Sequence, residues 1–79
     1  MADYVKKTTW EEFLSVRDDH LKDRTAINFA KEELYECMAR WADTLGEKII
    51  ETKYSRRKSK IPGYTDIVIK VVMGVKQNE

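Results

Sequence analysis

The spacing of the apolar residues changes at Gly46, and this change constrains the fold more than any other feature of the chain. Before Gly46, apolar residues recur every three or four positions, which predicts one continuous stripe along a helix. These residues are Ile27, Ala30, Leu34, Cys37, Met38, Trp41 and Leu45. After Gly46 the apolar residues alternate with a period of two, which is typical of strands. We therefore expect a helix over residues 25–45 that ends at a left-handed glycine cap, with strands after it.

Two strands and a connecting loop are expected after this helix. Residues 47–54 alternate weakly, and residues 65–75 alternate strongly. The second segment is apolar on both faces, which predicts a strand that is covered on both sides. Pro62-Gly63 marks a turn within the loop 55–63. The sequence therefore predicts an antiparallel β-hairpin, and its two-sided strand favours a homodimer in which a second chain covers one face.

A shorter helix is expected at the N-terminal end. Thr9-Trp10-Glu11-Glu12 has the form of a capping box, and the apolar residues that follow lie broadly at helical spacing. These features predict a helix over residues 10–22. The expected fold class is thus α+β, with two N-terminal helices followed by an antiparallel hairpin with a basic tip. Because a lone hairpin is marginal in water, either residues 4–6 add a third strand or two chains pair their sheets.

The length and the cysteine content limit how the fold can be stabilised. The 79 residues form one small domain, 1–79, which buries only a modest share of its surface. Cys37 is the only cysteine, so no internal disulfide can form, and one cysteine with one histidine (His20) cannot supply a closed zinc site. We expect no metal and no cofactor. Good packing or a second copy of the chain must then supply the stability.

Charge is distributed unevenly along the chain. Residues 1–47 carry seven Lys/Arg and eleven Asp/Glu, a balance of −4, whereas residues 48–79 carry eight and three, a balance of +5; together they give the net charge of +1. Five cations fall within eight residues that contain no acid: Lys53, Arg56, Arg57, Lys58 and Lys60. Tyr54 and Tyr64 flank the run. Such a cluster is self-repelling, so an anionic partner would relieve the repulsion.

Nucleic acid is the partner that this basic loop favours. Lys and Arg would neutralise phosphates and release counterions, and the tyrosines would stack on unpaired bases. Nothing in the loop predicts base-specific readout, so little sequence specificity is expected. Two alternatives remain open, namely a solvated loop kept soluble by its charges and an acidic protein surface as the partner.

Catalytic interpretations are weaker. Cys37 lies on the apolar stripe of the second helix, where a buried cysteine is usually inert, and His20 suits a helix C-terminus. Glu51-Thr52-Lys53 matches part of a metal-dependent nuclease site, with Asp66 as the extra acid, but the acid follows the tripeptide instead of preceding it. The sequence has no glycine-rich phosphate loop. We expect no enzyme, no catalytic residue and no small-molecule substrate.

A second function class is a small protein-binding regulator, an inhibitor or adaptor of the mobile-element type, acting through an aromatic and apolar surface. Exposure of Trp10 or Trp41 away from the basic segment would favour it. The unpaired cysteine, the lack of an export signal and the lack of a membrane-spanning stretch predict a cytoplasmic location without membrane contact. The expected layout resembles the arm-bearing half of bacterial histone-like DNA-binding proteins, and loosely a winged helix. The resemblance is one of layout alone and assigns no residue roles.

Overall fold

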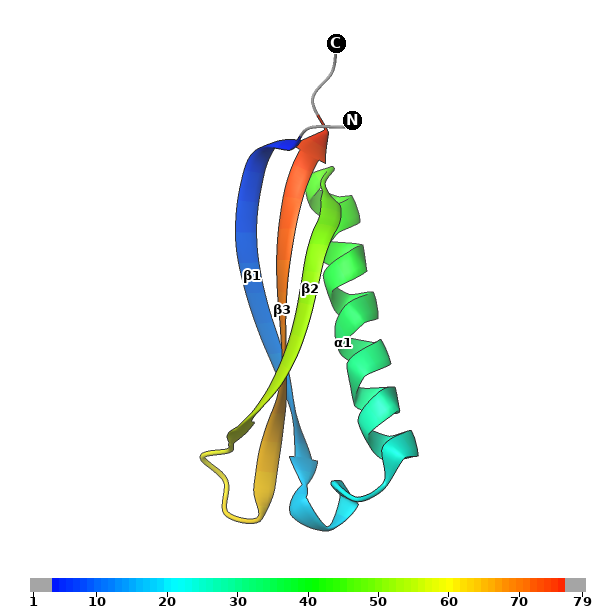
Figure 1. Cartoon of the computed structure of the whole chain (residues 1–79), viewed down its shortest axis with the longest axis vertical. Coiled ribbons are helices and arrows are strands. Elements are labelled where there is room, and N and C mark those ends of the chain that lie inside the picture. Colours follow the sequence, from blue (N-terminus) through cyan, green and yellow to red (C-terminus); the bar gives the residue numbers. More distant parts are fainter. Residues whose placement is uncertain (1–3, 77–79) are drawn as a thin grey trace.

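A computed structural model describes residues 4–76 of the chain, and the surroundings of the side chains over residues 8–75. Along the chain lie β1 (Tyr4–Arg17), α1 (Arg24–Leu45), β2 (Lys48–Lys58) and β3 (Tyr64–Lys76). A short 3-10 turn, Asp18–His20, leads from β1 towards the helix. The arrangement is therefore β-α-β-β (Figure 1).

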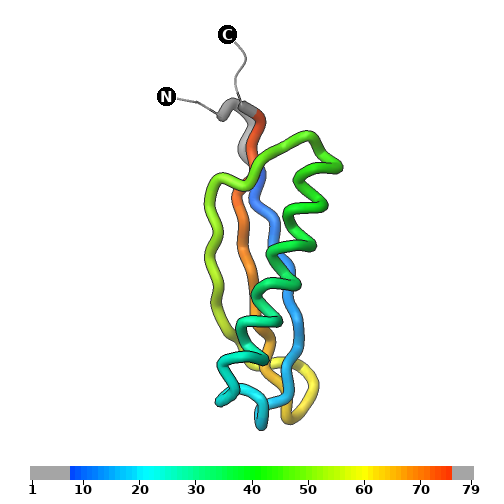
Figure 2. Tube along the Cα trace, turned by 90° about the vertical axis from the view of Figure 1, so that its right-hand side faces the viewer, coloured from blue at the N-terminus to red at the C-terminus, as the bar shows by residue number. Residues whose placement is uncertain are grey.

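β3 is the central strand of a three-stranded sheet with the order β1-β3-β2. It pairs antiparallel with both neighbours, and Val71 lies opposite both Trp10 of β1 and Thr52 of β2. β1 and β2 therefore run parallel to one another at the two edges, joined through the helix. The helix covers one face of the sheet and crosses it diagonally, with its N-terminal half nearer β2 and its C-terminal half nearer β1 (Figure 2).

The prediction of an N-terminal helix over residues 10–22 is wrong, because most of this segment belongs to β1. Trp10, Leu14 and Val16 are separated by even numbers, so an extended chain turns all three towards the helix. The capping box does not form, and Glu12 Oε1 instead accepts a hydrogen bond from the adjacent backbone amide of Phe13 (3.1 Å). The third strand expected from residues 4–6 exists but continues to Arg17. The likeness to histone-like and winged-helix layouts therefore does not hold.

Local signals define both ends of α1. The Asp23 side chain accepts hydrogen bonds from the backbone amides of Thr25 (2.9 Å) and Ala26 (3.4 Å), which satisfies two donors of the first turn. At the other end Gly46 has φ 72°, a left-handed conformation that side chains disfavour, and it closes the helix. The helix thus occupies Arg24–Leu45, where the sequence predicts 25–45.

The core lies between α1 and β3. Five helical residues pack onto four residues of the inner face of β3, and all nine side chains are buried. They are Ile27, Ala30, Leu34, Met38 and Ala42 of the helix, with Ile67, Ile69, Val71 and Met73 of the strand. The two edge strands contribute only partly buried residues to this layer, such as Trp10 and Ile49.

Part of the outer face of β3 is covered by the chain itself. Val68 is only 4% exposed although no second layer lies over it. Its cross-strand neighbour is Phe13, and the Arg57 guanidinium lies 4.8 Å from the Phe13 ring centroid, so the arginine side chain passes over β3 beside Val68. Lys70, further along this face, is exposed. At Val68 the chain itself therefore supplies the cover that the two-sided apolar pattern predicts.

The hairpin loop is much shorter than predicted. β2 extends to Lys58, so the connection spans residues 59–63 in place of the expected 55–63. The Ser59 hydroxyl accepts from the Ile61 amide (3.1 Å), and Gly63 takes φ 82° at the return into β3. Four of the nine residues of the predicted basic loop, including three of its four cations, therefore belong to the edge strand. No helix within residues 4–76 combines the length and apolarity that a membrane span requires.

Candidate nucleic-acid interface

Strand geometry divides the five clustered cations between two faces of the sheet. Successive side chains of a strand point to opposite faces, so Lys53 and Arg57 lie on the outer face, whereas Arg56 and Lys58 lie on the side that carries the helix. Lys60 lies beyond them in the turn. The prediction of one mobile basic tip is therefore wrong, and each group must be considered separately.

The two clustered cations on the outer face, Lys53 and Arg57, are paired with carboxylates of the chain. Lys53 Nζ lies 3.7 Å from Glu51 Oε1. Arg57 Nε donates to Asp66 Oδ2 (3.0 Å), and its Nη1 lies 3.6 Å from Glu11 Oε1. Arg57 thus ties β2 to both other strands. These two cations already have anionic partners, which removes the main reason to expect phosphate at this face.

Asp66 is the central acceptor of this outer-face network. Its side chain is buried, and it accepts a hydrogen bond from Ser15 Oγ (2.7 Å) as well as the one from Arg57. The hydrogen bond from Ser15 lowers the pKa of the Asp66 carboxyl, and the hydrogen bond and charge of Arg57 lower it further against the opposing effect of burial. The net pKa lies below the ordinary value, so Asp66 is ionised at neutral pH.

A pH-dependent stability follows from this network. Because the folded-state pKa of Asp66 is lowered, its contribution is complete above the unfolded-state pKa of about 4 and is lost as the pH falls through the folded-state value. We expect the acid loss of unfolding free energy to be shallower in Asp66→Asn than in the wild type, measured by urea denaturation from neutral pH downwards. Replacement of the exposed Asp43 by Asn is the control, and this variant should lose unfolding free energy with falling pH as the wild type does. The same pH dependence of the unfolding free energy in all three proteins would contradict this role of Asp66.

The other three clustered cations, two on the helix side and one in the turn, have no such partners. Within the described part of the chain, no carboxylate lies within 4 Å of Arg56, Lys58 or Lys60. The helix adds Lys31, whose Nζ lies 5.3 Å from the centroid of the Tyr54 ring. The Tyr54 hydroxyl donates to the Lys31 carbonyl oxygen (3.5 Å), and burial raises the pKa of this phenol, which therefore stays neutral. Tyr54 thus holds the helix and its lysine against β2.

We call this surface the β2 flank and define it by Arg24, Lys31, Tyr54, Arg56 and Lys58. Arg24 precedes Lys31 by seven residues, which is two helical turns, and so it lies on the same side of α1. On the same side of the helix, Asn28 lies between Arg24 and Lys31, and Tyr35 follows Lys31 by about one turn. Neither residue is acidic. The N-terminal half of α1 lies nearer β2 than β1 (Figure 2). The β2 flank therefore carries positive charge from both α1 and β2.

The structure brings together only part of the predicted site. Tyr54, Arg56 and Lys58 share the β2 flank, and Lys60 follows in the turn. Lys53 and Arg57 lie on the outer face, and Tyr64 borders a hollow on the opposite flank beside Leu14. Sequence reasoning missed Arg24 and Lys31. Their spacing of seven on one side of the predicted helix was a usable signal, but only the packing of the helix shows which strand they lie beside.

The candidate catalytic groups are not assembled. Glu51 lies opposite Val72 and Asp66 lies opposite Arg57, so about six residues, or roughly 20 Å, separate the two acids along the sheet. Residues 4–76 contain no group of three or more His, Cys, Asp or Glu side chains placed to hold a metal ion. The side chain of Cys37 was expected to be buried in the stripe, but it is exposed.

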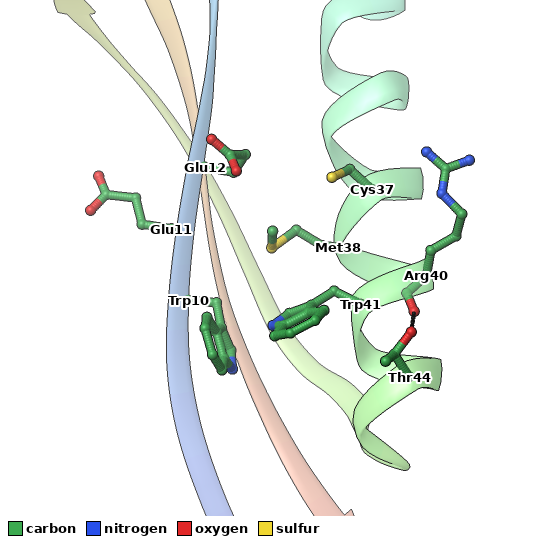
Figure 3. A pocket seen from close by; sticks show the side chains of 8 residues that line it. All are labelled: Trp10, Glu11, Glu12, Cys37, Met38, Arg40, Trp41 and Thr44. Atoms are coloured by element: carbon green, nitrogen blue, oxygen red, sulfur yellow. Dashed lines mark hydrogen bonds between the residues drawn. The ribbon is translucent and has the colours of Figure 1, made fainter.

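The opposite side of the molecule carries an aromatic surface. Trp10 and Trp41 meet edge to face, with ring centroids 5.4 Å apart, and together with Cys37 and Met38 they line a hollow of about 440 Å³ (Figure 3). Trp41 is 39% exposed. A second hollow of about 520 Å³ lies beside Leu14 and Phe29. This surface faces away from the β2 flank, because it lies between the helix and the other edge strand.

Comparison of the chain with protein-family models, with curated proteins and with solved structures gives no match.

Proposed function

We propose that this chain is a non-enzymatic nucleic-acid-binding module that holds the phosphate backbone on its β2 flank. The observation that supports this most directly is the set of cations without carboxylate partners, Arg56, Lys58 and Lys60, beside which the helix adds Lys31. Uncompensated positive charge on two adjoining elements raises the local concentration of a polyanion. Arg56 would engage phosphate through its planar fork, and the lysines as point charges.

The chemistry of the flank favours the backbone over the bases. One ring face of Tyr54 is near the Lys31 ammonium, so the tyrosine positions a cation more readily than it stacks on a base. Phosphate contacts fix position but carry no sequence information. We therefore infer binding with little sequence preference, to single or double strands, with Lys53 and Arg57 outside the contact set.

Salt titration tests this proposal. Fluorescence anisotropy with labelled single-stranded DNA, duplex DNA and RNA of mixed sequence should show binding at low salt. The logarithm of the binding constant should then fall linearly with the logarithm of the salt concentration. Each phosphate contact contributes a slope of about −0.9 on duplex and about −0.7 on single strands, so four contacts give roughly −3 to −4. Binding that does not change with salt, or no binding even at low salt, would overturn the proposal.

A second candidate function is a protein-binding regulator acting through the aromatic surface beside β1. The observation in its favour is that Trp41 is exposed in a patch on the flank opposite the basic one, along with Phe29, which is 61% exposed. In a pull-down from nuclease-treated lysate, this function predicts a bound protein that Phe29→Lys releases and Arg56→Ala does not. The reverse pattern would count against it.

The proposal includes a cytoplasmic location, which the free and exposed thiol of Cys37 supports. A maleimide that does not cross membranes should label Cys37 only after the cells are lysed. Labelling of intact cells would refute this location.

A further inference from the structure

We propose that a hollow on the outer face of the sheet, beside the β2 flank, receives one unpaired base of a bound strand. The module would then prefer single-stranded nucleic acid to duplex. This inference rests on the proposed function, because it names the form of nucleic acid that the module takes. The β2 flank holds phosphates, and the hollow holds a base that is attached to one of them.

The hollow lies at the hairpin end of the sheet, where the turn between β2 and β3 is on the side away from the helix (Figure 1). Its volume is about 530 Å³, which is within the range of pockets that bind small organic ligands. All three strands and the hairpin turn contribute to its wall. The residues that matter here are Phe13 of β1, Asp66 of β3, Arg57 and Lys58 of β2, and Lys60 and Ile61 of the turn.

Two apolar side chains in this wall are exposed to solvent. Phe13 is 46% exposed and Ile61 is 54% exposed, although they come from segments that are distant in sequence. Neither belongs to the core between α1 and β3. A flat apolar group that enters the hollow removes surface of both side chains from water, which favours its binding.

Arg57 supplies a fixed planar surface beside these side chains. Its guanidinium carbon lies 4.8 Å from the centroid of the Phe13 ring, and its Nε donates to Asp66 Oδ2 (3.0 Å), so the guanidinium is held in place. Because Asp66 and Glu11 neutralise its charge, Arg57 is not a phosphate contact. Unpaired bases stack on aromatic rings and on arginine planes alike. A surface that is already ordered loses little entropy on binding, so the Phe13–Arg57 pair is preformed for stacking.

Several hydrogen-bonding groups in the wall are already paired with one another. Asp66 accepts from Ser15 Oγ (2.7 Å) and from Arg57 Nε, and the Ser59 hydroxyl accepts from the Ile61 amide (3.1 Å). The described residues of the wall therefore offer a base mainly a stacking surface, and little with which to read its edges. Stacking tolerates every base, since each has a π-face. The hollow thus agrees with a module that has little sequence preference.

Two lysines connect the hollow to the β2 flank. Lys58 ends β2 and belongs to the flank, and it also lines the hollow together with Lys60. Neither lysine has a carboxylate within 4 Å among the described residues. The wall carries three cations and one carboxylate, a net charge of +2, which favours an anionic ligand. Inorganic phosphate would leave Phe13 and Ile61 uncovered and an uncharged ligand would leave the lysines unpaired, whereas a nucleotide satisfies both.

A duplex cannot use the hollow in the same way. Its bases are paired and stacked, and one of them reaches a protein pocket only if it leaves the stack at a cost in free energy. A duplex is therefore held by the β2 flank alone, whereas a single strand contacts both the flank and the hollow. One base stacked on an aromatic side chain raises affinity by on the order of tenfold.

Anisotropy titrations of the full chain at one low salt concentration test this inference with three labelled probes of equal length. The probes are oligothymidylate, duplex DNA, and an abasic strand that keeps the phosphates but has no bases. The wild-type chain should bind oligothymidylate about tenfold more tightly than the abasic strand, because only the former can fill the hollow.

Three variants then locate the base. Phe13→Leu keeps an apolar side chain beside Val68 but removes the ring, and it should weaken oligothymidylate binding about fivefold or more while leaving the duplex and the abasic strand unaffected. Ile61→Ala, in the exposed turn, should act in the same selective way by about twofold to threefold. Phe29→Leu makes the matched change at an exposed aromatic residue on the helix side of the sheet and should alter none of the three affinities.

Nuclear magnetic resonance gives a readout that does not depend on the variants. The ring current of a bound base should shift the Ile61 methyl and Phe13 ring resonances when oligothymidylate is added, and the abasic strand should leave them in place. Equal affinity for oligothymidylate and the abasic strand, or equal losses on oligothymidylate and duplex in Phe13→Leu, would overturn the inference. Salt-dependent binding of the duplex would survive either result, so the phosphate proposal would stand; absence of binding to all three probes would end both.

Discussion

The double variant Arg56→Ala/Lys58→Ala is expected to lose nucleic-acid affinity by on the order of tenfold per residue at low salt. Both side chains are exposed and have no carboxylate within 4 Å among the described residues, so their removal costs the fold little and removes two phosphate partners. The slope of log K against log salt should become shallower by about 1.4 on single strands and about 1.8 on duplex. Anisotropy titrations at several salt concentrations measure both quantities.

Lys48→Ala/Lys70→Ala is the matched control, because it removes the same net charge from exposed positions outside the β2 flank. If affinity depended on net charge alone, the two double variants would behave alike, and that result would contradict a localised interface. Lys31→Ala provides a further check, since this helical lysine should also reduce the slope by about one contact.

Ile69→Ala is expected to lower the free energy of unfolding by about 2–5 kcal/mol, a large share of the stability of so small a domain. Ile69 is 0% exposed at the centre of β3, beneath the helix, so truncation leaves a cavity that the close-packed layer cannot fully close. Urea denaturation followed by circular dichroism measures the loss, with an unchanged m-value showing that the unfolded state is unaffected.

Ile50→Ala makes the identical chemical change where the side chain is 38% exposed, at the bulge of β2. We expect a loss below about 1 kcal/mol there, because water already reaches much of the side chain. Equal losses at both positions would mean that the layer between α1 and β3 is not the main core.

The helix was predictable and the first strand was not, for a reason that particular residues show. The stripe from Ile27 to Ala42 fits only a helical period, and Asp23 and Gly46 mark its ends locally. Trp10 and Leu14 lie four residues apart, a spacing that fits one face of a helix and also, being even, one face of a strand. Pairing with β3 decides between the two, and no local signal reports that pairing.

In the candidate site, too, some features were predictable from the sequence and others depend on contacts between distant segments. The sequence reveals five cations without an acid among them, but Glu11 and Asp66, which pair with Arg57, are distant from it in sequence. Once β2 is extended, alternation assigns Arg56 and Lys58 to one side and Lys53 and Arg57 to the other. The strand was expected to end at Tyr54, and this boundary led to the incorrect prediction of a single basic loop.

The sequence by itself determined the elements that depend on short-range chemistry: the helix with its caps, the strongly alternating strand β3, and the surplus of positive charge after Gly46. Only the tertiary structure decided that β3 lies in the middle of the sheet, that Arg57 is neutralised, and that Lys31 joins Arg56 and Lys58. The physical reason is that caps and periods act over a few residues, whereas strand order and ion pairing depend on contacts between segments distant in the chain. Those contacts form only when the core between α1 and β3 is buried.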